Sequence, residues 1–492
     1  MAARHFRPGK IAWPVRLTQT ILAAGFLASF LSFNQPQAIS KTIALNFGVT
    51  MSNANELWMA QANGPFIEFA RSLDVTVMTE PSGYSKTNID HLVKKYSKVA
   101  KEINKTRSNQ IDQTTVVFNL SESFSDPARV PNLTMNENPM PVIHALKQQT
   151  TSGLMMSYGY GGGTANMEWE TLTGMSLGNL DKTLTTPYNQ TVSRQKEGAA
   201  VTTQFPYSAA IHPYLASFYN RAAVYKKFGF NKFENLDNTA YPIRYQKRLG
   251  KSPYLSDETA YKNAVAQIKS HKGSQFINLV TMQNHMPYTA NEYGNSPYSM
   301  SGTAIKDSAT KAAFQTYAQG LKYSDEAVSD FVKQIDKIQK PIIWVFYGDH
   351  LAALYNGVDT IAKYAVQLHQ TDYFIYANKY ARQHGAKTKL TNTKQVGSSD
   401  FIALAYAQAN AKVNPFVALL TKVQQDLPTI WTRSESTSDI TDGMSFVTSN
   451  GQQVNYDTLT VKQKKLLHDY QLLQYDIVAG KQYSLAAGFQ SK

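Results

Sequence analysis

PIIWVFYGDH, residues 341–350, is the stretch that decides the fold. Its first seven residues are apolar or aromatic without polar alternation, the pattern of a strand buried on both faces of a parallel sheet. A glycine and two ionisable residues, Asp349 and His350, follow at once. Similar runs predict three further strands, TTVVFNL at 114–120, QFINLVTM at 275–282 and DYFIYA at 372–377.

Helical patterns lie between these strands. They cover residues 139–149, 165–175, 213–228, 257–270, 309–338 and 399–412. Strands that alternate with helices predict an α/β fold, a mostly parallel sheet flanked by helices on both faces.

The pattern also predicts the organisation of the chain. The catalytic body is expected at residues 111–427, followed at 428–492 by a small C-terminal α+β subdomain that closes with an amphipathic helix near 461–476. Residues 41–110 are expected to form a helical juxtamembrane linker, with helices over 52–72 and 87–104.

The first 40 residues predict a membrane segment. LTQTILAAGFLASFLSF, residues 17–33, follows a basic flank of Arg4, Arg7, Lys10 and Arg16. A basic flank stays on the cytoplasmic side, so the body is expected outside the cell on a single-pass anchor. The apolar run is short, so a cleaved export signal is the alternative.

Composition excludes several classes of protein. None of the 492 residues is a cysteine, which excludes disulfides, thiolate metal ligands and a cysteine nucleophile, and favours a Gram-positive cell surface over a eukaryotic secreted protein. The net charge is +14, yet no nucleic-acid-binding motif is present, so no nucleic-acid partner is expected. Anionic lipid headgroups, a polyphosphate product or a generally basic surface explain the charge equally well.

Ionisable residues follow three of the predicted strands. Glu122 comes just after the first strand, His285 follows the strand at 275–282, and Asp349 and His350 follow the deciding strand. Because the carboxyl ends of parallel strands meet at one edge of the sheet, these side chains are expected to gather there. Carboxylates and an imidazole in one place indicate a divalent metal site.

A glycine-rich segment carries the candidate nucleophile. In GYGGGTANMEWETL, residues 159–172, four glycines lead to Thr164 and a helix follows. Threonine is a good N-cap, and a helix start binds anions. Alone, Thr164 is more simply an ordinary cap; beside Glu122, Asp349 and His350 it is a candidate metal-activated nucleophile.

A further segment carries His212, Tyr219 and Arg221. On the helix predicted over 213–228, these side chains point toward one end, and an arginine beside a metal can clamp a phosphate. Taken alone, the segment is more often a solvated helix face.

From about residue 55 to about 485 the chain resembles the lipoteichoic acid synthase family, phosphoglycerol transferases of the alkaline-phosphatase/sulfatase superfamily. The motifs that carry the resemblance are Ser121-Glu122-Ser123, the glycine-rich approach to Thr164, His212 with Phe218-Tyr219-Asn220-Arg221, Asn284-His285-x-Pro287-Tyr288, Tyr347-Gly348-Asp349-His350 and Gln474-Tyr475-Asp476-Ile477.

The resemblance implies one divalent ion, Mn²⁺ or else Mg²⁺, bound by Glu122, Thr164, Asp349 and His350. It implies that Thr164 attacks phosphatidylglycerol, releases diacylglycerol and carries a glycerophosphoryl group to a polyglycerolphosphate chain on a glycolipid. The residues implied to contact the substrate are His212, Tyr219, Arg221 and His285.

Three departures from the family leave other functions open. The family usually has five membrane helices where one is visible here, tryptophan where this chain has Tyr219, and Ser-Asp where it has Ala165-Asn166. The alternatives are a phosphodiesterase or phosphatase, a phosphoethanolamine-type transferase, or a non-catalytic surface-binding paralogue. An arylsulfatase is disfavoured, because its nucleophile derives from cysteine or serine and Thr164 stands here.

Overall fold

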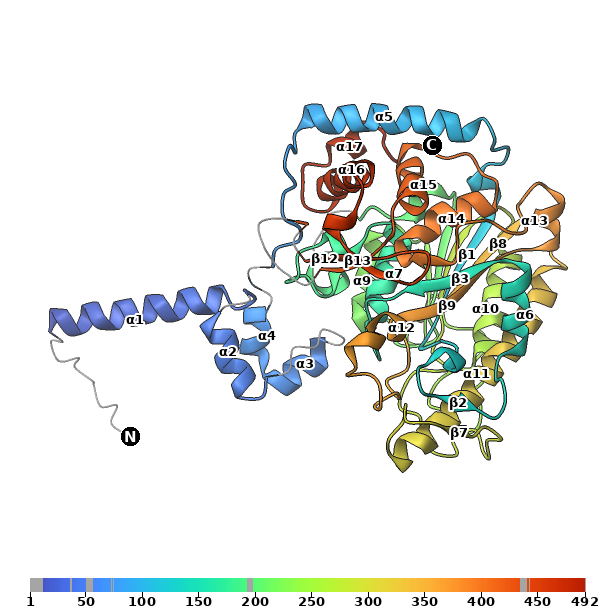
Figure 1. Cartoon of the computed structure of the whole chain (residues 1–492), viewed down its shortest axis with the longest axis horizontal. Coiled ribbons are helices and arrows are strands. Elements are labelled where there is room, and N and C mark those ends of the chain that lie inside the picture. The colour runs from blue at the N-terminus through green and yellow to red at the C-terminus, as the bar shows by residue number, and fades with distance from the viewer. Residues whose placement is uncertain are drawn as a thin grey trace. The chain divides into compact units, whose positions relative to one another are not determined.

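The computed structural model describes residues 12–35, 38–49, 56–71, 73, 75–192, 198–433, 440–441 and 443–491. The chain forms two compact units, the smaller from residues 1–76 with 183–185 and the larger from 77–182 with 186–492 (Figure 1). The expected linker therefore contributes residues to both units. The domain limits expected from the sequence remain predictions.

An eight-stranded sheet forms the centre of the larger unit. Its order is β10 (Gln395–Gly397), β3 (Thr151–Met156), β9 (Gln370–Ala377), β8 (Ile342–Gly348), β1 (Thr115–Ser121), β6 (Phe276–Val280), β4 (Ser208–Ile211) and β5 (Lys232–Glu234). All neighbours pair in parallel except β9, which runs antiparallel to both β8 and β3. The mostly parallel α/β fold is confirmed.

Helices cover both faces of this sheet (Figure 1). One face carries α6 (Pro141–Gln149), α10 (Asp257–Ser270) and α11 (Ser308–Ile335). The other carries α7 (Thr164–Thr173), α14 (Phe401–Gln408) and α15 (Pro415–Asp426). The strands β1, β6 and β8 are buried along their whole length, which explains their unbroken apolar sequences.

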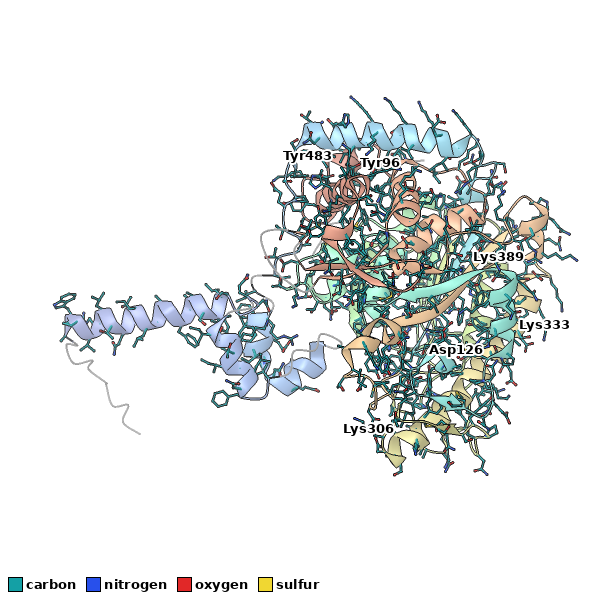
Figure 2. The ribbon with its side chains drawn as sticks, viewed as in Figure 1. Tyr96, Asp126, Lys306, Lys333, Lys389 and Tyr483 are labelled. Atoms are coloured by element: carbon teal, nitrogen blue, oxygen red, sulfur yellow. The ribbon has the colours of Figure 1, made fainter. Side chains whose placement is uncertain are left out.

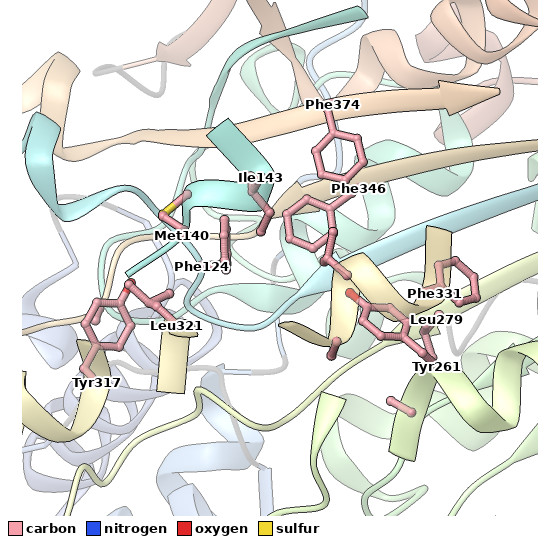
Figure 3. Packing of buried hydrophobic residues seen from close by; sticks show 14 of the residues in the cluster. Phe124, Met140, Ile143, Tyr261, Leu279, Tyr317, Leu321, Phe331, Phe346 and Phe374 are labelled. Carbon is pink, nitrogen blue, oxygen red and sulfur yellow. The ribbon is translucent and has the colours of Figure 1, made fainter. Parts of the chain in front are cut away.

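Trp344 lies at the centre of the core on the α10–α11 face and is fully buried. Its ring centroid lies 4.7 Å from that of Phe331, 5.1 Å from Phe374 and 5.8 Å from Tyr261, all close to edge-on. Figure 3 shows Phe331, Phe374 and Tyr261 among the buried residues of this core. Edge-to-face contacts of this kind add to the burial of apolar area. The alternate residues of β8 face the opposite helices, and Tyr347 packs there on Phe401 of α14.

The C-terminal segment completes the larger unit. It forms a three-stranded antiparallel sheet of β11 (Thr429–Arg433), β12 (Met444–Val447) and β13 (Gln453–Asn455), then α16 (Val461–Val478) and α17 (Tyr483–Ala486). The expected α+β character of this segment is confirmed.

The long helix α5 (Lys86–Asn104) packs against α15, α16 and α17. Tyr96 points inward from α5, as Figure 2 shows, and its hydroxyl donates to Asp469 on α16 over 2.9 Å. Its N-cap is Ser85, whose side chain accepts from Asn88 N, rather than Thr87 or Asn88 as the sequence suggested. The helix predicted over 87–104 is therefore part of the larger unit.

The smaller unit is helical, with α1 (Trp13–Leu31), α2 (Ile39–Asn46), α3 (Glu56–Asn63) and α4 (Pro65–Arg71). The single helix expected over 52–72 is two helices, because Gly64 adopts a φ of 82° between them. Among the described residues, α1 alone is long and apolar enough to span a membrane, with 19 residues and a mean hydropathy of 1.3. This helix fits a single-pass anchor.

The prediction of a helix over 213–228 is wrong for its first half, which is not an α-helix. The chain leaves β4 at Ile211, makes a 3-10 turn, η6 (Phe218–Asn220), and only then forms α9 (Arg221–Lys227). Tyr219 and Asn220 have positive φ values of 54° and 56°, which interrupt the helix. The helical spacing of the apolar residues does not reveal this break.

Replacing Trp344 by Ala is expected to lower the free energy of unfolding by about 3–5 kcal/mol, because it opens a cavity among the aromatic rings around it. Chemical denaturation of the full chain measures the change. Tyr241→Ala is the control, because Tyr241 is 44% exposed. Equal effects of the two substitutions would contradict the assignment of Trp344 to the centre of the core.

Candidate active site

The site begins at the shared end of two neighbouring strands. Strands β1 and β8 pair in parallel so that Ser121 lies opposite Gly348, and each strand is followed by one carboxylate, Glu122 and Asp349. The turn after β1 passes so close to β8 that a Cβ on Gly348 would lie 1.7 Å from the Phe124 carbonyl oxygen. Only glycine fits there, so the glycine before Asp349 is what lets the two carboxylates approach.

Three side chains converge at this edge of the sheet. The ligand atoms of Glu122, Asp349 and His350 all lie within 4.8 Å of one another. His350 Nε2 is 3.2 Å from Asp349 Oδ2 and 3.6 Å from Glu122 Oε1. None of the three residues is more than 3% exposed. The structure thus brings together three of the four side chains that the sequence placed at one sheet edge; His285 is not a member of this group.

The hydrogen bonds around the cluster leave its inner atoms as acceptors. His350 Nδ1 donates to the Leu351 carbonyl over 3.0 Å, which leaves Nε2 with a lone pair toward the carboxylates. Asp349 Oδ1 accepts from Ser123 N at 2.7 Å and His350 N at 2.9 Å, while Oδ2 accepts no hydrogen bond from any described residue. Acceptors that converge in a buried place are stabilised by a proton or a cation between them.

The pKa values of Asp349 and His350 also reflect the negative charge that is crowded into this buried place. Burial, reinforced by the charge of Glu122, raises the pKa of Asp349 to about 6. Burial lowers the pKa of His350, but the charges of Asp349 and Glu122 outweigh it and the net direction is upward. Two carboxylates and an imidazole suit a divalent metal, so these residues fit the ion that the sequence predicted.

Thr164 lies against this cluster. Its Oγ1 donates to Glu122 Oε2 over 3.3 Å, and the residue is 3% exposed. Thr164 is the first residue of α7 and not its N-cap; the cap is Gly163, whose φ of 96° favours glycine. The expected capping role is therefore wrong, while the expected place at the helix start is correct.

The glycine-rich loop is tied to the segment after His350. Gly161 N donates to the Leu351 carbonyl over 2.9 Å, and a Cβ on Gly161 would lie 2.5 Å from the Ala353 Cβ. The loop that carries the hydroxyl is therefore tied directly to the strand end that carries the imidazole. This contact holds Thr164 beside the cluster and presents the start of α7, a favourable place for a phosphate.

Arg221 and His212 contact each other and are both fully buried. Arg221 Nε and Nη2 lie 3.0 and 2.9 Å from Glu168 Oε2, and Nη1 is 3.3 Å from His212 Nε2. His212 Nδ1 donates to the Val280 carbonyl, and burial with the charge of Arg221 lowers the pKa of His212. The guanidinium charge is thus paired with a carboxylate of the protein.

Glu168 is a residue that the sequence interpretation missed. It lies on α7 one turn after Thr164 and also accepts from the Tyr225 hydroxyl and, over 3.2 Å, from Asn278 Nδ2. The i, i+4 spacing of Thr164 and Glu168 within TANME was the available signal, since such residues share a helix face. A glutamate in a helix offers no sign of its burial.

Tyr219 lies next to Arg221, whose Cζ is 5.2 Å from the Tyr219 ring centroid. Burial, followed by the charge of Glu122, raises the pKa of Tyr219 to about 12. His285, half-buried after β6, directs Nδ1 at the Met286 carbonyl over 2.6 Å. The roles expected for these residues in substrate binding remain predictions.

A mostly parallel α/β sheet with a candidate nucleophile and a metal-type cluster at its carboxyl edge is the arrangement of the alkaline-phosphatase/sulfatase superfamily. A family model described as sulfatase matches residues 114–411. The chain belongs to the sulfatase family.

Among solved structures, the chain is similar to phosphoglycerol transferase GacH of Streptococcus pyogenes, determined in complex with sn-glycerol-1-phosphate. The two are 32% identical with a TM-score of 0.71, over 84% of this chain and 98% of the other. This similarity confirms the resemblance to phosphoglycerol transferases.

Two curated relatives are also similar. A putative cyclic β-1,2-glucan modification protein of Rhizobium meliloti is 29% identical over 448 residues, which are 87% of this chain and 64% of that protein. Lipoteichoic acid synthase 1 of Bacillus subtilis is 27% identical over 166 residues, which are 33% of this chain and 22% of that protein. The chain therefore spans less than two thirds of the length of either relative.

Metal binding is expected to depend on Asp349. The purified full chain should bind about one divalent ion, and Asp349→Asn should weaken binding at least about tenfold because a charged ligand is lost. Titration with Mn²⁺ followed by elemental analysis measures both. Asp359→Asn, at an exposed aspartate, is the control and should bind as the parent does. Undiminished binding by Asp349→Asn would remove the proposed metal site.

The buried pair of Glu168 and Arg221 is expected to be essential for stability. Glu168→Gln keeps the side-chain size but leaves the guanidinium buried and uncompensated, at a cost of about 3–5 kcal/mol in the free energy of unfolding. Denaturant titration measures the loss. The matched control is Glu102→Gln, which removes an exposed pair with Lys105 and should change little. The assignment fails if both variants unfold alike.

Proposed function

We propose that the chain is a metal-dependent phosphoglycerol transferase, which moves glycerophosphate from phosphatidylglycerol to a hydroxyl of a cell-surface acceptor. The observation that carries this proposal is the Thr164 hydroxyl, 3.3 Å from Glu122 Oε2 in a buried cluster with Asp349 and His350. The similarity to a phosphoglycerol transferase along most of the chain supports the choice of transferred group.

In the first half-reaction Thr164 Oγ1 forms a bond to the phosphorus of phosphatidylglycerol. The bond from phosphorus to the diacylglycerol oxygen breaks, and the hydroxyl proton ends on the departing diacylglycerol. Thr164 then carries glycerophosphate as a phosphodiester. A divalent ion held by Glu122, Asp349 and His350 would lower the pKa of the Thr164 hydroxyl and offset charge on the phosphoryl oxygens.

In the second half-reaction an acceptor hydroxyl forms a bond to the same phosphorus. The bond to Thr164 Oγ1 breaks, and the acceptor's proton returns to the threonine. The start of α7 supplies backbone N–H groups toward the phosphoryl oxygens in both steps.

Four more residues are proposed to position the transferred group. Tyr219 and half-buried His285 are proposed to contact the glycerol and phosphate oxygens. Arg221 and His212 are proposed to act without touching the transferred group, because Glu168 already pairs with the guanidinium. We propose Mn²⁺ as the metal, with Mg²⁺ as the alternative, because mixed carboxylate and imidazole ligands suit the former.

The acceptor is proposed to be a saccharide or glycolipid hydroxyl. The chain is similar over 87% of its length to a protein named for modification of cyclic β-1,2-glucan, but over 33% to a lipoteichoic acid synthase. The difference in coverage favours a glycan that is decorated over a polyglycerolphosphate chain that is extended. The enzyme is proposed to act at the outer surface of the membrane, on the anchor that α1 fits.

Thr164→Ala is expected to abolish release of diacylglycerol from labelled phosphatidylglycerol, because the attacking oxygen is absent. The assay uses the full chain in vesicles with Mn²⁺, and mass spectrometry searches the parent for a glycerophosphate adduct on Thr164. Thr106→Ala, at an exposed threonine, is the control. Turnover that survives in Thr164→Ala would overturn the proposed mechanism.

The same assay separates the alternative functions. Faster diacylglycerol release with a glucan oligosaccharide, together with glycerophosphorylated sugar, supports the decorating transferase. Free glycerophosphate as the sole product indicates a phosphodiesterase instead. Preference for phosphatidylethanolamine as donor indicates the phosphoethanolamine-type transferase.

A further inference from the structure

The smaller unit exposes large apolar side chains beyond its spanning helix. On and just after α2, Ile39 is 70% and Phe47 is 87% exposed, and Ile43 and Leu45 are exposed as well. On α4, Phe66 and Phe69 are more than half exposed. We call these six residues the apolar foot. Clustered exposed apolar residues on a small unit indicate an interaction surface.

Charged side chains are withdrawn from the same surface. Among residues 38–49 and 60–71, whose side chains the structure describes, none that carries a charge is exposed. Lys41 is half-buried, and Arg71, 8% exposed, pairs with Glu68 at 2.8 Å. A surface that meets water normally carries lysine, arginine, aspartate and glutamate. This surface is suited to an apolar environment.

The foot is built onto the end of α1. Ser40 N donates to Ser29 Oγ over 3.0 Å, which ties α2 to the last turns of α1. The ring of Phe30, one residue before α1 ends, lies 4.5 Å from that of Phe66 and 6.4 Å from that of Phe69. The basic flank that includes Arg16 places the opposite end of α1 in the cytoplasm. The foot therefore lies where α1 leaves the outer leaflet.

We propose that the apolar foot is immersed in the outer membrane interface, so that α2 and α4 lie on the bilayer while α1 spans it. Helices of this kind bury their apolar side about 5–10 Å into the boundary between headgroups and acyl chains. The catalytic unit would then be connected to a surface-bound element and not to a free linker. This inference rests on the outward-facing anchor of the proposed function, but not on the reaction that the enzyme catalyses.

The absence of cysteine makes a direct test available, because a single introduced cysteine is the only labelling site. The full chain carrying Phe47→Cys, Ile43→Cys or Phe66→Cys is labelled with bimane and placed in vesicles of equal parts phosphatidylcholine and phosphatidylglycerol. Spin-labelled lipids quench probes in the bilayer, and iodide quenches probes in water. Lys98→Cys, at an exposed position on α5, is the matched control.

The expected result is quenching by lipid and protection from iodide at the three foot positions, with the reverse at the control. Replacing Ile43 and Phe66 by Ser should weaken lipid quenching of a probe at position 47. Iodide quenching at the foot would overturn the proposal by placing it in water. Protection from both quenchers would overturn it by showing that protein, either the larger unit or a second copy, covers the foot.

Discussion

Two carboxylates that leave neighbouring parallel strands impose the central constraint on this molecule. The register of β1 with β8 puts Glu122 and Asp349 one residue beyond paired positions, and their ligand atoms lie within 4.8 Å of each other. At that separation two unit charges repel by about 3.5 kcal/mol for an effective dielectric constant of about 20. Burial prevents water from relieving the repulsion. The rest of the site must therefore compensate the negative charge of the two carboxylates.

Backbone and side-chain hydrogen-bond donors around the two carboxylates compensate part of their charge. Backbone N–H groups of Ser123 and His350 neutralise one oxygen of Asp349, and the Thr164 hydroxyl faces Glu122. The His350 ring is held through Nδ1 by the Leu351 carbonyl, so that Nε2 faces the carboxylates. The remaining carboxylate oxygens and His350 Nε2 are suited to bind a divalent cation, next to the Thr164 hydroxyl.

Much of this arrangement could be predicted from the sequence, because buried parallel strands are recognisable as unbroken apolar runs. The strands that carry Glu122, Asp349 and His285 were all of that kind, so the edge where they meet followed from topology. The strands β3, β4, β5 and β10 were missed, because they are short or contain Gly, Ser, Lys and Gln. Since β4 was missed, His212 was expected on a helix instead of at a strand end.

Residues whose role depends on long-range pairing were beyond the sequence. Nothing in MEWE distinguishes Glu168 from a solvated helix residue, and only the fold shows that Arg221 lies 53 positions later in contact with it. The left-handed backbone of Tyr219 and Asn220 was hidden for a similar reason: it is imposed by the turn that brings Arg221 back toward α7. Local patterns report periodicity, whereas these features are set by what the chain meets after folding.

The position of Glu168 links the chemistry to the scaffold. One helix, α7, begins with Thr164 and carries Glu168 a turn later, so the nucleophile and the partner of Arg221 share a rigid element. Any shift of α7 that moved the hydroxyl away from Glu122 would also pull Glu168 from a fully buried guanidinium, which is costly in a medium of low dielectric. Tyr219 packs against the same ion pair, because the Arg221 Cζ lies 5.2 Å from the Tyr219 ring centroid. The hydroxyl is therefore held from both ends: by the glycine-rich loop at its N-terminal side and by a buried ion pair one turn beyond.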